Sequence, residues 1–182
     1  MTCCVLAGVG RQAERADLVE STLIEGKHVV TAPGMDLDEM KQMAEIAAGH
    51  PGQLCILDME MRFLECVAAL RSMLHDGALG ELHSVAGSFR CAFGLQFRGD
   101  RRHTWWHSRR QGGGAIATCA PRLVDLMCHV SGHRVGRVQA SGSRGAETLL
   151  NWEGLVRPMT TEDAAEISLE MHEDEHGSNR PW

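Results

Sequence analysis

Short apolar runs alternate with amphipathic helical stretches in the first 60 residues, and this alternation limits the possible fold more than any other feature. The apolar runs lie at 3–7, 27–31 and 53–59, and the helical stretches lie at 12–25 and 36–49. Strands of nearly continuous apolar residues are typical of a parallel sheet that helices cover on both faces. Asp36 and Glu39 form a capping-box pattern at the start of the second helix. The pattern therefore predicts a βαβαβ unit.

The pattern changes after residue 60. Helices are predicted over 62–75 and 115–130, and Pro121 is expected to kink the second helix or to start it afresh. Three further segments are predicted to be strands: 84–97, 134–141 and 164–171. The first and last of these alternate polar with apolar side chains, which is typical of an antiparallel sheet with one solvated face.

These patterns divide the chain into two parts and a tail. The predicted fold class is α/β, with a partial Rossmann-type parallel sheet in residues 1–60. A partial α+β domain with a mostly antiparallel sheet is expected in residues 61–171. Residues 172–182 are polar and acidic, and we expect them to form a disordered tail.

Composition excludes several classes of function. A net charge of −6 argues against general nucleic-acid binding, which requires a basic face. No apolar run is long enough to span a membrane, and the N-terminal residues lack the basic region of a signal peptide. The seven cysteines are scattered without a C-x-x-C pair, which favours reduced thiols and a cytoplasmic protein. The basic run at 98–110 is either a solvated loop or a contact for an anion or substrate.

One candidate cofactor motif follows the first predicted strand. Gly8 and Gly10 begin a G-x-G-x-x-A match that precedes a helix, where backbone amides can hold a pyrophosphate. The second strand should then end in an acidic residue for the ribose hydroxyls, but Ala32 and Pro33 stand there. The motif is therefore either a pyrophosphate loop or a simple turn from strand to helix.

Two further features lie between residues 103 and 114. The three consecutive glycines at 112–114 precede a predicted helix and imply close backbone approach or positive φ, where an anion or polar ligand could sit. A flexible hinge is the alternative. His103 and His107 have helical spacing, but no acidic third ligand is close in the sequence. We therefore predict no metal site.

Several segments, taken in their order, resemble the glucose-fructose oxidoreductase / inositol dehydrogenase family. These segments are 26–33, 36–49, 62–82, 112–132 and 160–164. The first resembles the family's G-K-H-V strand, with Thr31-Ala32-Pro33 in place of Glu-Lys-Pro. The others are similar to its R-F helix, its G-x-L-G-E turn, its G-G-G helix with a D-L…G ending and its T-x-D-D/E entry to a strand. The resemblance covers 26–171 and looks closest to the animal glucose-fructose oxidoreductase domain-containing proteins.

The resemblance implies a Rossmann domain, an α/β domain with an open antiparallel sheet, and hydride transfer between NAD or NADP and a sugar or polyol. The catalytic Lys, Asp and His positions of the family correspond to Ala32, Thr118 and Arg122. The candidate cofactor contacts are Gly8, Gly10, Ala32 and Pro33. The candidate substrate pocket consists of Trp106, Gly113, Gly114, Thr118 and Arg122.

Oxidation of an alcohol requires a base for its hydroxyl proton, and none of these three replacements can serve. Three hypotheses follow: an oxidoreductase with altered site chemistry, an inactive relative that binds or dimerises through its C-terminal sheet, and an incomplete gene product. The third arises because the spacing to Lys27 favours assigning the first strand as the family's fourth. The first βαβ half would then be absent, and strand edges would be exposed.

Overall fold

The computed structural model describes residues 3–6, 12–33, 37–90 and 103–173, and its N-terminal part is a parallel sheet. The strands are β1 (Cys3–Leu6), β2 (His28–Thr31) and β3 (Cys55–Leu57), in the order β1-β2-β3. Helix α1 (Gln12–Ile24) connects the first two strands, and α2 (Leu37–Ala48) connects the second and third. The predicted βαβαβ unit is therefore confirmed.

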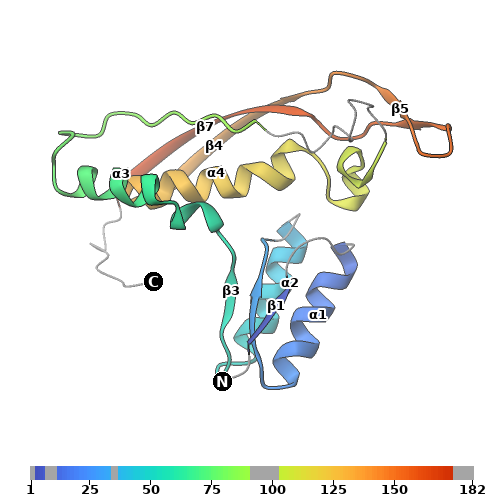
Figure 1. Ribbon diagram of the computed structural model, residues 1–182, viewed down its shortest axis with the longest axis horizontal. Helices are drawn as coiled ribbons and strands as arrows, with labels where there is room; N and C mark the ends of the chain where they lie inside the picture. The colour runs from blue at the N-terminus through green and yellow to red at the C-terminus, as the bar shows by residue number, and fades with distance from the viewer. Residues whose placement is uncertain (1–2, 7–11, 34–36, 91–102, 174–182) are drawn as a thin grey trace.

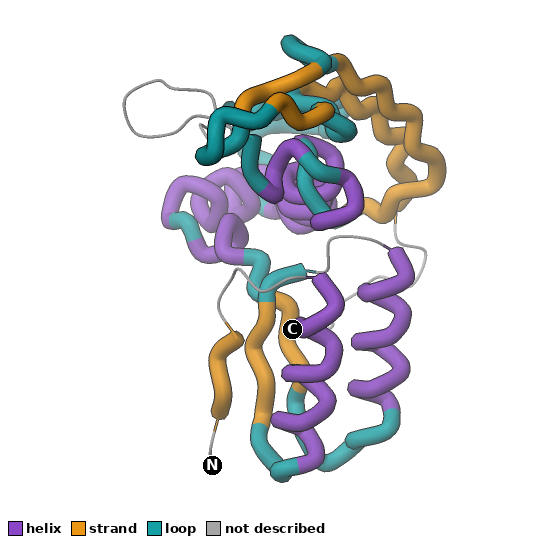
Figure 2. Tube along the Cα trace, turned by 90° about the vertical axis from the view of Figure 1, so that its right-hand side faces the viewer, coloured by secondary structure: helices purple, strands orange, loops and turns teal. Residues whose placement is uncertain are grey.

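Both helices of this unit lie on the same side of the sheet (Figure 2). They enclose one apolar core with β2: Ala16, Val19, Leu23, Val29 and Met43. Val30 and Ile56 are paired in register and point to the other face, where Ile56 is 49% exposed. The expectation that helices cover both faces is wrong for the described residues. Apolar strand residues favour burial but do not specify whether a second layer is present.

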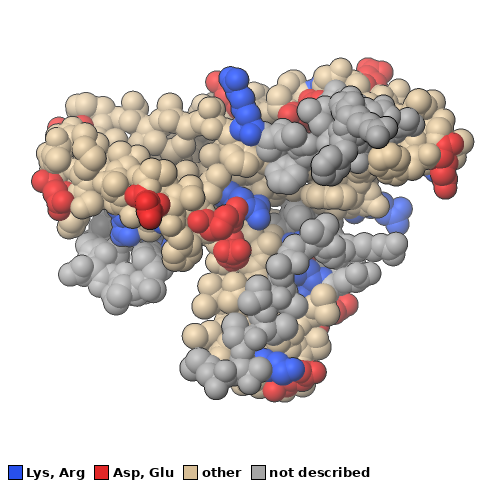
Figure 3. Space-filling view, viewed as in Figure 1, with Lys and Arg blue, Asp and Glu red and all other residues tan. Residues whose placement is uncertain are grey.

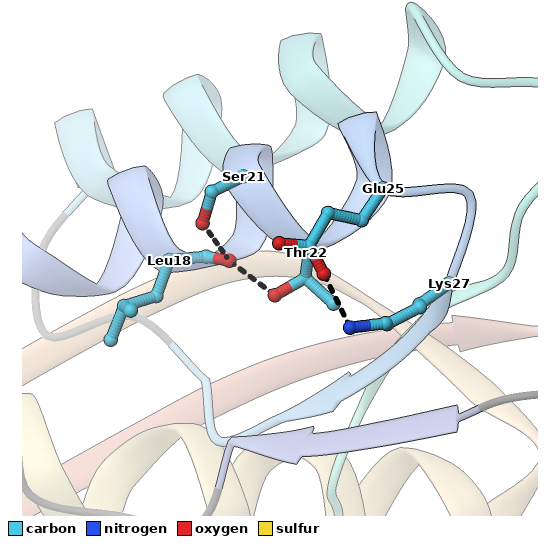
Figure 4. A network of polar contacts seen from close by, with 5 residues as sticks. All are labelled: Leu18, Ser21, Thr22, Glu25 and Lys27. Atoms are coloured by element: carbon cyan, nitrogen blue, oxygen red, sulfur yellow. Dashed lines mark hydrogen bonds and ion pairs between the residues drawn. The ribbon is translucent and has the colours of Figure 1, made fainter.

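Helix α1 ends where the sequence predicted. The hydroxyls of Ser21 and Thr22 both donate to the Leu18 carbonyl, at 3.1 and 2.6 Å (Figure 4). Gly26 follows with a positive φ of 73°, a conformation that costs glycine less than any other residue. The chain therefore turns directly from α1 into β2.

A buried ion pair joins α1 to the start of α2. Arg15 donates from Nη1 to the Pro33 carbonyl at 2.9 Å, and the same atom lies 3.7 Å from Glu39 Oε2. The two side chains are each 4% exposed. Glu39, which the sequence placed in a capping box, thus pairs with Arg15, while Asp36 lies outside the described residues. The pair fixes the chain that follows β2 against α1.

The described residues of the second part, 60–90 and 103–173, form two longer helices, three 3₁₀ turns and four strands. They are η1 (Glu60–Phe63), α3 (Glu65–His75), η2 (Trp105–His107), η3 (Arg109–Gln111), α4 (Ala115–Ser131), β4 (His133–Ser143), β5 (Thr148–Leu150), β6 (Val156–Pro158) and β7 (Ala164–Glu173). Helix α4 contacts α3, β4 and β7, and both helices lie between the strands β4 and β7 and the parallel-sheet part (Figure 1).

Antiparallel pairing follows the prediction in β4 and β7. Their register runs from the pair His133–Glu173 to the pair Ser143–Ala164. Strand β7 thereby extends through Glu173, into the segment expected to be a disordered tail, while residues 174–182 lie outside the described residues. The hairpin β5–β6 was not predicted.

One expectation for this part is wrong, and of the two alternatives for Pro121 the fresh helix start is excluded. Residues 82–90 form no strand although their side chains alternate, and the rest of that predicted strand, 91–97, lies outside the described residues. Alternation supplies a suitable face, but a strand also needs a neighbour for its backbone groups. Helix α4 continues through Pro121 without restarting, because packing against α3, β4 and β7 can outweigh local propensity.

No helix in the described ranges combines the length and apolarity that a membrane span requires.

Candidate functional site

The two parts of the chain meet where the parallel sheet ends. Strand β3 leads directly into η1, and η1 contacts α4. Figure 3 shows acidic and basic side chains next to each other at this junction. Ligands of open α/β sheets bind beyond the carboxyl ends of the strands, so this junction is the candidate site.

Two crossed ion pairs connect η1 to α4. Arg62 donates from Nε to Asp125 Oδ2 at 2.7 Å and from Nη2 to Asp125 Oδ1. Arg122 donates from Nε to Glu60 Oε1 at 2.9 Å. Each element thus contributes one acidic and one basic side chain, and the pairs fix α4 above the end of β3.

The two pairs differ in burial and in geometry. The side chains of Arg62 and Asp125 are 26% and 13% exposed, and their contact is bidentate. Arg122 and Glu60 are 27% and 52% exposed, and a single donor nitrogen joins them. Bidentate, partly desolvated pairs are stronger than exposed single contacts. The first pair therefore holds the structure together, while the second is open to exchange with a ligand.

Ionisable groups around the first pair are shifted by burial and by one another. The hydrogen bond to Asp125 raises the pKa of Arg62, so its guanidinium stays charged. Burial raises the pKa of the Cys128 thiol, and the nearby Asp125 adds to the effect. Burial lowers the pKa of His129, and the positive charges of Arg71 and Arg62 lower it further. At neutral pH this side of α4 therefore carries a neutral thiol and a neutral imidazole beside one ion pair.

The N-terminus of α4 holds a carboxylate from the protein itself. Glu162 Oε1 accepts a hydrogen bond from the Ile116 amide at 2.8 Å, and the Glu162 carbonyl accepts one from the Ala115 amide at 3.1 Å. An anion at a helix N-terminus is stabilised by the exposed amides and the helix dipole. The sequence predicted an anion or polar ligand there or a hinge, and the position is filled by Glu162 instead.

The triple glycine allows close packing at this helix start. A Cβ on Gly113 would lie 2.2 Å from the Trp106 carbonyl oxygen, and one on Gly114 would lie 2.6 Å from Glu162 Oε1. Gly114 also has a φ of 106°, which L side chains rarely adopt. Trp106 is 4% exposed, and its carbonyl accepts the Thr161 hydroxyl at 2.9 Å. These contacts argue for a rigid helix start rather than a hinge.

Thr118 and Arg122 lie one helical turn apart on α4. The Thr118 hydroxyl donates to the Gly114 carbonyl at 2.6 Å, and the side chain is 7% exposed. Arg122 donates from Nη1 to the Thr118 carbonyl at 2.8 Å, in addition to its bond with Glu60. The structure thus brings Gly114, Thr118 and Arg122 together. Glu60 was not among the residues singled out from the sequence, because its partner lies 62 positions away.

The predicted cofactor contacts are only partly described. Gly8 and Gly10 lie outside the described residues, while Ala32 is half-buried and Pro33 is buried at the end of β2. Strands β1 and β2 pair in parallel and α1 lies between them in the sequence, which is a βαβ topology of the kind found in dinucleotide-binding domains. Ala32 and Pro33, the described residues directly after β2, supply no carboxylate for the ribose.

The two histidines of the 103–107 segment bond to the protein. Their ring centroids are 5.7 Å apart, His103 Nε2 lies 3.1 Å from the Pro158 carbonyl, and His107 Nδ1 accepts the Thr104 amide at 3.0 Å. Among the described residues, no group of three or more His, Cys, Asp or Glu side chains could hold a metal ion.

A protein-family comparison identifies the chain. Residues 67–178 match the model described as the GFO/IDH/MocA C-terminal domain. This chain belongs to the GFO/IDH/MocA family. Its match covers α3, α4 and the antiparallel strands, which are the elements that carried much of the resemblance seen in the sequence.

Similar proteins include both oxidoreductases and a regulator. An uncharacterised oxidoreductase of Synechocystis sp. is 25% identical over 163 residues, which is 87% of this chain and 43% of the relative. A levoglucosan dehydrogenase solved with NADH and L-sorbose is 16% identical with a TM-score of 0.74, over 93% of this chain and 45% of that one. The Gal80p super-repressor mutant of Saccharomyces cerevisiae is 16% identical, also with a TM-score of 0.74, over 97% and 47%. The chain spans less than half the length of these proteins.

The packing at the triple glycine predicts the effect of a substitution. Gly113→Ala should destabilise the protein by about 1–3 kcal/mol, because the new methyl group would overlap the Trp106 carbonyl. Urea unfolding followed by circular dichroism measures the change in the free energy of unfolding. Gly52→Ala is the control, since nothing lies within 4 Å of a Cβ there. Equal effects of the two substitutions would contradict the packing interpretation.

The ion pairs predict a second difference in stability. Asp125→Ala should lower the free energy of unfolding by about 1.5–3 kcal/mol, because it removes two charge-assisted hydrogen bonds from Arg62. Glu60→Ala should lower it by only about 0.2–1 kcal/mol, as is usual for an exposed pair. Urea unfolding of both variants checks the order, and a larger loss for Glu60→Ala would contradict it.

Proposed function

We propose that the protein is an NAD(P)-dependent oxidoreductase that acts on a sugar or polyol, with a site chemistry altered from that of its family. The observation that carries the proposal is the junction itself: α4 of the matched domain lies over the carboxyl end of a parallel sheet of dinucleotide-binding topology. The levoglucosan dehydrogenase relative, solved with NADH and a sugar, supports the same assignment. When bound, the nicotinamide supplies an acceptor or donor for hydride.

The altered chemistry follows from the three replaced positions. The Thr118 hydroxyl is already bonded to Gly114 and cannot take a proton at ordinary pH. Arg122 stays protonated and acts as a donor or anion contact, and Ala32 can do neither. Loss of one general base costs about 10²–10⁴ in rate, so these positions alone would leave hydride transfer impaired.

Finer assignments extend this proposal. The free thiols at Cys55, Cys66, Cys119 and Cys128 support a cytoplasmic location.

The proposed subgroup is that of the animal glucose-fructose oxidoreductase domain-containing proteins, because the segments 26–33, 36–49, 62–82, 112–132 and 160–164 resemble them, although the Synechocystis relative is bacterial. In the proposed substrate pocket, the buried residues Trp106, Gly113 and Gly114 have a packing role: they hold the start of α4 in place.

Cofactor titration tests the proposed function. Adding the 182-residue protein to NADH or NADPH should produce a saturable change in nicotinamide fluorescence, because ligands of open parallel sheets bind beyond the carboxyl ends of the strands. Glu45→Gln, an exposed change on α2, is the control and should bind equally well. Failure of both cofactors to saturate at millimolar protein would contradict the proposal.

A second candidate function is an inactive relative that acts through binding or dimerisation. Strands β4 and β7 form a two-stranded ribbon with largely exposed side chains, and Val138 is 57% exposed. Isolated two-stranded pairs are marginally stable, so a covering partner would stabilise this one. Gal80p, a transcriptional regulator by the description of its Kluyveromyces relative, supports the idea that this fold can serve regulation.

Oligomeric state tests the second candidate. If the ribbon pairs with a second copy, size-exclusion chromatography with light scattering should give a dimer, and Val138→Lys should shift it toward the monomer. The added charge would have to be desolvated in the interface. Val156→Lys, an equally exposed change on the β5–β6 hairpin, is the control. A monomer at all concentrations would contradict dimerisation through the ribbon.

A further inference from the structure

We infer that Glu60 is the proton acceptor of this oxidoreductase, in place of the residues that the family's pattern would supply. The inference rests on the proposed function and adds a catalytic residue to it. An alcohol loses hydride efficiently only when a neighbouring base takes its hydroxyl proton. The three replaced positions leave that role empty, so the base must come from another element.

Glu60 lies where such a base is needed. It is the first residue of η1, two positions beyond Asp58, whose amide still bonds to the carbonyl of Thr31 at the end of β2. The carboxyl ends of β2 and β3 therefore lie directly beneath it. From this edge its carboxylate reaches Arg122 on α4, at 2.9 Å. Glu60 thus spans the junction between the sheet and the helix that carries the replaced positions.

The carboxylate is held in place but is not fully used. Its side chain is 52% exposed, and within the described part of the chain Arg122 Nε is its hydrogen-bond donor, through Oε1. The second oxygen, Oε2, can accept a proton or a hydrogen bond from a ligand. Because the Arg122 guanidinium stays charged at all ordinary pH values, it can orient the Glu60 carboxylate through this hydrogen bond.

Other carboxylates that contact α4 are already engaged. Both oxygens of Asp125 accept hydrogen bonds from Arg62, and its side chain is 13% exposed. Glu162 caps the first turn of α4 through the Ile116 amide. Glu60 is therefore the carboxylate at this helix that combines exposure with an available oxygen.

Arg122 and Glu60 can act on the same hydroxyl group. Arg122 uses Nε for Glu60 and Nη1 for the Thr118 carbonyl, which leaves the hydrogens of Nη2 for a substrate oxygen. A substrate hydroxyl can accept from Nη2 while it donates to Glu60 Oε2. In oxidation the O–H bond would break and its proton would move to Glu60, while the C–O bond would become a carbonyl; the oxidised nicotinamide, when bound, would supply the acceptor for the hydride that leaves carbon. The guanidinium stabilises the negative charge that develops on oxygen.

Chemical rescue tests this assignment. With sorbitol, glucose and myo-inositol as probes, and NAD or NADP as oxidant, Glu60→Ala should lower kcat by about 100-fold or more. Added formate should restore turnover in proportion to its concentration, because the small carboxylate can bind to Arg122 where Glu60 was. Glu60→Gln, which keeps an acceptor for Arg122 but no base, should be as slow as the alanine variant. Glu45→Ala is the control and should keep wild-type turnover with no response to formate.

Each result decides the inference. Three results would overturn it. The first is wild-type turnover in Glu60→Gln, and the second is a slow Glu60→Ala variant that formate does not rescue. The third is no reduction of either cofactor by the unaltered protein. Nicotinamide fluorescence titrations separate this failure from failure of the proposed function. If NADH and NADPH bind to the wild type and to Glu60→Ala alike but turnover does not depend on Glu60, only the assignment of the base is wrong. If neither cofactor binds to the unaltered protein, the proposed function fails as well.

Discussion

The crossed ion pairs between η1 and α4 are the constraint on which the site depends. Arg62 and Asp125 form a partly buried bidentate pair, whereas Arg122 and Glu60 form an exposed contact through one donor. The first pair is suited to hold α4 over the end of β3, since desolvated charge-assisted bonds are strong and directional. The second pair gains little from its own contact and can therefore respond to a ligand. One face of one helix thus combines a structural anchor with a reactive pair.

The start of α4 is fixed by packing. Glu162 supplies the negative charge that the helix N-terminus favours, and Gly113 and Gly114 let the chain pass close to Trp106 and Glu162. A glycine-rich segment before a helix is compatible with a ligand site, a hinge or tight packing. The residue that decides among these, Glu162, lies 46 positions away from the amide that it binds. Local sequence therefore predicted the close backbone approach at Gly113 and Gly114 but not Glu162 as the group at the helix N-terminus.

Much of the fold could be predicted from particular residues. The apolar runs ending at Thr31 and Leu57, and Gly26 after α1, marked the parallel unit and its helix boundary correctly. Alternation marked β7, but the same alternation in 82–90 did not produce a strand, because strand formation also depends on a neighbouring backbone. Pro121 failed as a helix breaker since contacts with α3, β4 and β7 hold α4 continuous. Of the residues in the proposed site, the sequence singled out Thr118 and Arg122, whose roles stay predictions, but not Glu60.

The sequence by itself determined which chemistry is missing from the expected positions. Ala32, Thr118 and Arg122 cannot accept a proton, whatever their surroundings, because this follows from the side chains themselves. Only the tertiary structure decided which groups stand beside them. It turned Glu162 into a helix cap, placed both α1 and α2 on the same face of the parallel sheet, and brought Glu60 to Arg122. Hydrogen bonds and ion pairs act over a few ångströms in space, and residues far apart along the chain meet only once it has folded.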